Sequence, residues 1–119
     1  MAVRGDDDVD LAGRVCRMVL HRAEPGFAAK LAAAAAEFAR PGFEQALATH
    51  LRANPELVEA WATWSADQRW SPSAYVEGTE VGWYDGGRHD VRRHPDRAAA
   101  AADFIHRTSV WLAYERVVR

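Results

Sequence analysis

Two carboxylates and two imidazoles occupy a span of ten residues, at Asp85, His89, Asp90 and His94. Such a set could bind a divalent cation, or one carboxylate could orient a histidine as a general base. The spacing argues against both, because on a strand His89 points away from the face that holds Asp85 and Asp90. No CxxC, HExxH or EF-hand pattern accompanies these residues. We therefore expect no metal and no cofactor, and the sequence identifies no catalytic residue.

The same region carries a local basic run, formed by Arg88, Arg92, Arg93 and Arg97. Arginines beside aromatic residues can bind phosphate or single-stranded nucleic acid. Here aspartates are interleaved with the arginines, and the whole chain has a formal net charge of −2. Exposed charge pairs of this kind contribute less than about 1 kcal/mol each. Nucleic-acid binding is therefore disfavoured, and solvated ion pairs are expected instead.

Composition indicates a packed globule. The chain has 119 residues, of which 49% are hydrophobic and 27% charged, and we expect one domain over residues 9–119 after a flexible tail at residues 1–8. The single cysteine, Cys16, lies in an apolar helical pattern and should be buried and unreactive.

No apolar run is long enough for a membrane span and the N-terminus lacks the order of a secretion signal, so a cytoplasmic location is expected. Frequent arginine and alanine, with Lys30 the only lysine, suggest a bacterial genome.

The first half of the chain is predicted to be helical. Apolar residues at helical spacing predict a first helix over residues 9–23, and two similar signals, Glu24-Pro25-Gly26-Phe27 and Arg40-Pro41-Gly42-Phe43, predict an antiparallel pair of short helices. Asn54-Pro55-Glu56 has the residue types of a helix start, with asparagine as the N-cap, and predicts a fourth helix over residues 55–69.

After Pro72 the periodicity changes to two. Strands are predicted over residues 74–76, 81–85 and 88–92, with Gly86-Gly87 as a two-residue hairpin loop. The first connection is expected to be the four residues 77–80, because a two-residue loop would place Glu77 opposite Glu80. A long helix from about His94 to Val117 should cover this sheet. The expected fold is α+β, with about four N-terminal helices, an antiparallel three-stranded meander and a long C-terminal helix.

Strand alternation divides this sheet into two faces. The face with Val76, Val81 and Trp83 has the better apolar centre and should pack on the last helix. The other face would present Tyr75 and Tyr84 on either side of Gly82, with His89 opposite Tyr84. A glycine between two aromatic rings leaves a notch suited to binding, although one ring can instead simply cover the glycine.

These features favour non-catalytic recognition of another protein. The predicted protein is a small bacterial regulatory, accessory or immunity-type module, because aromatic and arginine residues gather in one segment without catalytic geometry. The contact residues would be Trp70, Tyr75, Tyr84, His89 and Arg93.

Two other functions stay open. The alternative is a small enzyme or ligand-binding domain, with a site between the meander and the helical layer that uses Asp85, His89, Asp90 or His94. A cavity lined by Trp61, Trp64 or Trp83 would favour that alternative. The third is nucleic-acid binding. Self-association is also plausible, through apolar positions of the last helix at Trp111, Tyr114 and Val118.

Overall fold

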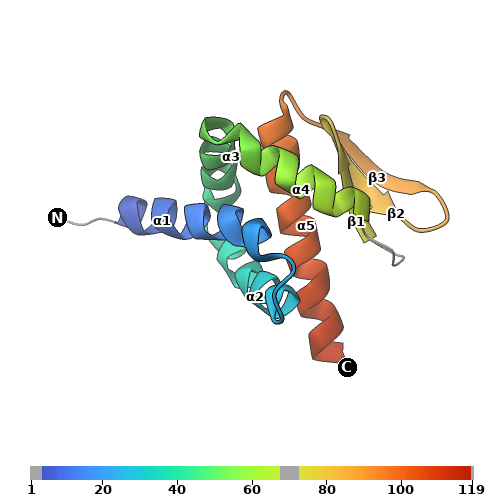
Figure 1. The fold of residues 1–119 in the computed structure, drawn as a ribbon, viewed down its shortest axis with the longest axis horizontal. Helices are drawn as coiled ribbons and strands as arrows, with labels where there is room; N and C mark the ends of the chain where they lie inside the picture. The colour runs from blue at the N-terminus through green and yellow to red at the C-terminus, as the bar shows by residue number, and fades with distance from the viewer. Residues whose placement is uncertain (1–3, 68–72, 119) are drawn as a thin grey trace.

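The computed structural model describes residues 4–67 and 73–118, and within them it confirms the α+β architecture (Figure 1). Four helices and two short 3₁₀ segments precede a three-stranded antiparallel meander and a long final helix. None of the described helices is long and apolar enough to cross a membrane. The elements are α1 (Arg4–Arg17), η1 (Met18–His21), α2 (Phe27–Ala33), η2 (Ala34–Ala39), α3 (Phe43–Ala53), α4 (Pro55–Asp67), β1 (Ser73–Glu77), β2 (Glu80–Tyr84), β3 (Arg88–Arg93) and α5 (Arg97–Val118).

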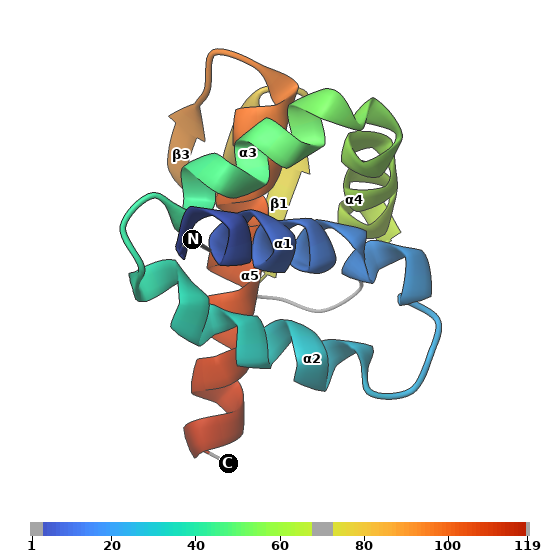
Figure 2. The same ribbon diagram turned by 90° about the vertical axis from the view of Figure 1, so that its left-hand side faces the viewer.

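Helix α5 lies at the centre of the molecule. It packs on α2, α3 and α4 as well as on β1 and β2, so it is surrounded along much of its length (Figures 1 and 2). Its first half is buried on nearly every side, including Ala98, Ala100, Phe104 and Ile105. The alanine run after Arg97 therefore does more than favour a helix, because small side chains let several neighbours approach one axis. The sequence predicted only that this helix would cover the sheet.

The two Pro-Gly signals form the same turn. Gly26 and Gly42 have φ of 90° and 81°, and the amide of the following phenylalanine donates to the carbonyl three residues earlier in each case. This is the pattern of a type II turn, which requires a positive φ that glycine adopts without strain. The helices begin at Phe27 and Phe43, so the prolines lie in the turn and not in the first helical turn.

Helices α2 and α3 do not form the expected antiparallel pair. Each packs mainly on α5, and α1 lies between them in Figure 2. Helix α1 also begins at Arg4, five residues before the predicted start. Helix α4 begins at Pro55 as predicted, but the side chain of Asn54 donates to the carbonyl of His50 at 2.8 Å. Asn54 therefore satisfies the C-terminal end of α3.

The register predicted for β1 and β2 is confirmed. Val76 lies opposite Val81 and Tyr75 lies opposite Gly82 in an antiparallel sheet of order β1-β2-β3. Val76 and Val81 are buried in the core, as expected for the face that meets α5. The outer edge of β1 is covered by α4, because the amide of Val76 donates to Oγ of Ser65 at 3.0 Å. That contact blocks this edge from pairing with another strand.

Both predicted loops are wrong by a residue or more. The first has two residues, Gly78 and Thr79, so Glu77 does lie opposite Glu80. This pairing is tolerated because Arg88 binds both carboxylates at 2.7 Å. The second loop has three residues, since Tyr84 pairs with Arg88.

A β-bulge in β3 changes the predicted faces. The register shifts by one residue between Val81 and Trp83, and Asp90 adopts a φ of 50°. The extra residue reverses the orientation of the earlier part of β3 relative to a regular strand. His89 therefore lies opposite Trp83, and Arg88 lies opposite Tyr84. The prediction that His89 shares the face of Tyr84 is wrong for this reason.

Candidate functional site

The predicted notch beside Gly82 is filled. Tyr75 is only 9% exposed, and a Cβ at Gly82 would lie 2.9 Å from its ring. The Tyr75 hydroxyl donates to Glu80 at 2.6 Å, and the guanidinium of Arg88 lies 4.7 Å from the ring centroid. The ring thus covers the glycine. Of the two interpretations that the sequence allowed, a binding notch or simple packing of a ring on the glycine, the structure has the second.

Glu80 is the centre of a charge network on this outer face. It accepts from Tyr75 and pairs with Arg88 at 2.7 Å and with Arg93 at 3.1 Å, while Arg88 also binds Glu77. The hydrogen bond from Tyr75, followed by the two arginines, lowers the pKa of Glu80. Burial and the bond to Glu80 raise the pKa of Tyr75. We call these five residues, Tyr75, Glu77, Glu80, Arg88 and Arg93, the outer-face network, and at neutral pH its central Glu80 is held ionised.

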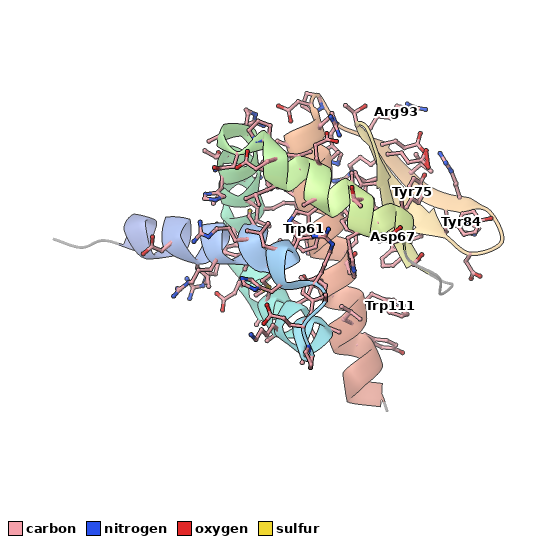
Figure 3. All side chains as sticks on the ribbon, viewed as in Figure 1. Trp61, Asp67, Tyr75, Tyr84, Arg93 and Trp111 are labelled. Atoms are coloured by element: carbon pink, nitrogen blue, oxygen red, sulfur yellow. The ribbon has the colours of Figure 1, made fainter. Side chains whose placement is uncertain are left out.

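The five residues predicted to contact a partner do not lie together on one surface. Trp70 lies outside the described residues. Tyr75 and Arg93 belong to the outer-face network, whereas Tyr84 is 50% exposed near the tip of the β2–β3 hairpin, at the other end of β3 from Arg93 (Figure 3). His89 faces the other side of the sheet and its Nε2 lies 3.1 Å from the carbonyl oxygen of Asp85. Tyr84, His89 and Arg93 are exposed, but His89 is on the opposite face of the sheet from Tyr84 and Arg93.

The four acid and base residues of the meander do not converge. His94 Nε2 lies 2.8 Å from Oδ2 of Asp103 on α5, and not near Asp85 or Asp90. Arg107 donates to Oδ1 of Asp103 and to the backbone carbonyl of Asp90, so this part-buried cluster ties the end of β3 to α5. Within residues 4–67 and 73–118, no group of three or more histidine, cysteine or acidic side chains has the arrangement of a metal site.

The structure contains a pocket whose polar residues sequence analysis did not identify as a site. It has a volume of about 330 Å³ and lies between α3, the sheet and α5, with a lining of Glu44, Trp83, Arg92, Asp103, His106, Arg107 and Val110. We call it the meander–helix pocket.

In this pocket the imidazole of His106 is hydrogen-bonded to the carboxylate of Glu44. Nδ1 of His106 lies 2.7 Å from Oε1 of Glu44, and the His106 ring stacks on Phe38 with a centroid distance of 4.3 Å. A carboxylate at Nδ1 fixes the orientation of an imidazole and leaves Nε2 free for a ligand or a proton. Sequence analysis missed this pair because its members are 62 residues apart, on helices that meet only in the folded chain.

The last helix leaves apolar area exposed near its end. Tyr114 is 64% exposed and Trp111 is partly exposed, while the side chain of Val118 is outside the described set. Figure 3 shows Trp111 on the part of α5 that extends away from the sheet. Self-association through this end remains a prediction.

No protein-family model matches this chain, and no curated protein or solved structure matches it.

Proposed function

We propose that the protein is a non-catalytic recognition module that binds another protein through β3 and the accessible part of the outer face. The observation that carries this proposal is the exposure of β3, in which all six residues are exposed. The other edge strand, β1, is covered by α4, so β3 is the open edge of the sheet. Three of its residues are arginines, and the half-exposed Tyr84 lies opposite the first of them.

Recognition at this edge would use side chains and not strand addition. The bulge at Asp90 interrupts regular pairing and charged residues line the strand, both of which discourage a further strand. Arginine and tyrosine are the residue types that most often dominate protein interfaces. Arg92 is on the face toward α5 but is exposed at this open edge and has no ion-pair partner among the described residues, so a carboxylate of a partner that covers the edge could pair with it. The partner surface that fits is therefore acidic, with an apolar site for Tyr84.

Tyr75 has a supporting role in this proposal. It is nearly buried and holds Glu80, which in turn orients Arg88 and Arg93. Trp70, outside the described residues, remains a proposed contact from the segment before β1.

The test is quantitative capture from an extract of the source cells. A Tyr84→Ala, Arg93→Ala double variant should lose a captured partner by more than about tenfold, as expected for hot-spot residues. The matched control is Tyr114→Ala with Arg40→Ala, which removes the same two residue types from other exposed positions. Circular dichroism would verify that all three proteins are folded. Identical capture profiles for wild type, double variant and control would rule the proposal out.

A second candidate is supported by the meander–helix pocket. An oriented imidazole beside an aromatic wall, Trp83, is an arrangement that a small-ligand site or an enzyme could use. The alternative expected a site between the meander and the helical layer; this pocket lies between α3, the sheet and α5, and its polar residues are not the expected ones. A screen of small carboxylates by NMR should shift the Trp83 and His106 signals, and His106→Gln should remove the response. Absence of any shift at both residues would exclude the candidate.

A further inference from the structure

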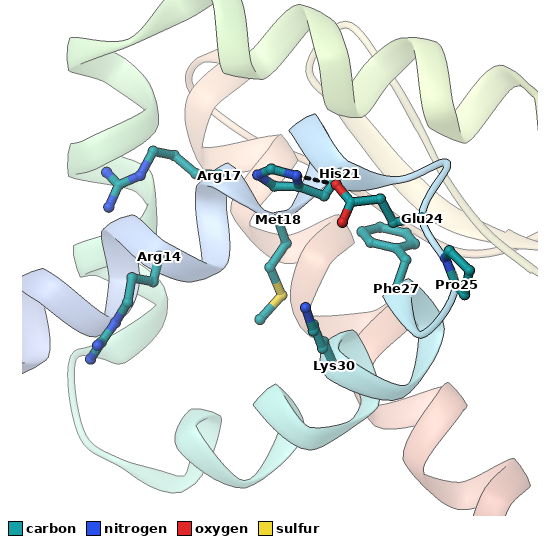
Figure 4. A pocket seen from close by; sticks show the side chains of 8 residues that line it. All are labelled: Arg14, Arg17, Met18, His21, Glu24, Pro25, Phe27 and Lys30. Carbon is teal, nitrogen blue, oxygen red and sulfur yellow. Dashed lines mark hydrogen bonds and ion pairs between the residues drawn. The ribbon is translucent and has the colours of Figure 1, made fainter.

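A second pocket lies on the opposite part of the helical layer from the meander, between α1 and α2. Its volume is about 240 Å³, and its lining is Arg14, Arg17, Met18, His21, Glu24, Pro25, Phe27 and Lys30. Figure 4 shows Met18 and Lys30 pointing toward one another across the space between the two helices, with Arg14 further along α1. We call it the α1–α2 pocket.

Positive charge is concentrated around this pocket. Arg14 and Lys30, the only lysine of the chain, have no hydrogen-bond or ion-pair partner within residues 4–67 and 73–118. Arg17 contacts Nε2 of His50 at 3.4 Å, which does not neutralise its charge. The one carboxylate in the lining belongs to Glu24 and is paired with His21. In a chain with a net charge of −2, two cations without a partner, Arg14 and Lys30, therefore border a single concavity, whereas the guanidinium of Arg17 is turned toward His50 on α3.

The floor of the pocket is apolar and firmly held. Phe27 is 8% exposed and makes an edge contact with the ring of Trp64 at 5.3 Å. Met18 packs against the core from the other side, and its flexible thioether can adapt to a ligand. A ligand that fits must therefore combine negative charge with a small apolar group.

We propose that the α1–α2 pocket binds a small phosphate monoester, with the phosphate between Arg14 and Lys30 and the organic group on Met18 and Phe27. A phosphate monoester carries about −1.5 to −2 charge near pH 7 and three acceptor oxygens, so it can satisfy two cations better than a single carboxylate does. Arginine offers forked donors and lysine a mobile point charge, so the two side chains can hold a tetrahedral group from two sides. The small volume restricts the organic group to about one ring.

The phosphate could belong to a soluble metabolite or to a lipid headgroup, and the test separates the two. Phenyl phosphate is the soluble probe, followed by NMR and by fluorescence of the tryptophans that contact Phe27. Vesicles of phosphatidylcholine with and without phosphatidic acid provide the lipid arm. Binding of phenyl phosphate supports the soluble source, and binding only to vesicles with phosphatidic acid supports the lipid source.

Variants assign the binding to this pocket. Arg14→Gln and Lys30→Gln should each weaken phenyl phosphate binding about tenfold, the effect of losing one charge-assisted hydrogen bond. Arg97→Gln changes net charge equally but lies at the start of α5, outside both proposed sites, and it should leave the affinity unchanged. Because Arg14 and Lys30 are exposed, these variants should keep the wild-type melting temperature. Met18→Ala should weaken phenyl phosphate more than inorganic phosphate.

Three results would overturn the proposal. One is no binding of phenyl phosphate at about 10 mM together with no binding to either vesicle, since the affinity would then be below any useful range. Another is equal affinity for benzoate, which would remove the preference for phosphate. The last is an equal loss in Arg97→Gln, which would indicate a response to net charge alone.

Discussion

Gly82→Ala directly tests the packing of the Tyr75 ring against Gly82 on the outer face of the meander. A Cβ at this position would lie 2.9 Å from Cε1 and 2.9 Å from Oη of Tyr75, and 3.0 Å from the carbonyl oxygen of His89. Carbon atoms pack best at about 3.5–4.0 Å, so the added methyl group is roughly half an ångström too close to the ring. The ring cannot move away freely, because it is nearly buried and its hydroxyl is bonded to Glu80.

The expected cost follows from opposing effects. Overpacking of a well-packed site costs about 1–3 kcal/mol, and weakening the hydrogen bond to the charged Glu80 adds to it. Alanine is better than glycine inside a strand by about 0.5–1 kcal/mol, which offsets part of this cost. We expect Gly82→Ala to lower the free energy of unfolding by about 2 kcal/mol, which is a fall of about 8 °C in Tm for a chain of this size.

Urea and thermal unfolding followed by circular dichroism would measure this change. Gly87→Ala is the matched control, since a Cβ there meets nothing within 4 Å, and its stability should equal that of the wild type. In a Tyr75→Val background the ring is absent, so Gly82→Ala should cost much less. A wild-type Tm for Gly82→Ala, or the same loss with and without the Tyr75 ring, would refute the packing described for this face.

Three further predictions concern buried polar groups. Ser65→Ala should cost about 1–3 kcal/mol and speed hydrogen exchange at Val76, whose amide would lose its acceptor. Ser109→Ala should raise stability by about 1 kcal/mol in urea unfolding, because Oγ of this fully buried serine has no partner among the described residues. Burial raises the pKa of Cys16 from 9.0 to about 12, so its thiol should resist Ellman's reagent in the folded protein at pH 8. As pH rises, the thiol ionises in the unfolded chain before it ionises in the folded protein. The free energy of unfolding should therefore be about 1.4 kcal/mol lower at about pH 10 than at pH values well below 9. This decrease should be smaller in Cys16→Ala, which has no thiol to ionise.

Local sequence signals predicted the elements because they act over a few residues. The Asn54-Pro55 boundary, the two Pro-Gly turns and the pairing of Val76 with Val81 all depend on backbone preferences or on strand alternation. The outer-face network was not predicted. Glu77 and Glu80 were expected to repel each other, and no local pattern indicated that Arg88 would bind both.

The sequence by itself determined the α+β class, the order of the elements and the apolar face of β1 and β2, because hydrophobic periodicity and turn residues encode these locally. Tertiary structure alone decided the bulge at Asp90, which moved His89 to the other face, since a single extra residue leaves almost no trace in periodicity. It also decided both pockets. Glu44 meets His106, and Arg14 and Lys30 line one pocket, only after the helices have packed in the folded chain, and no local pattern specifies which of their side chains will share a concavity.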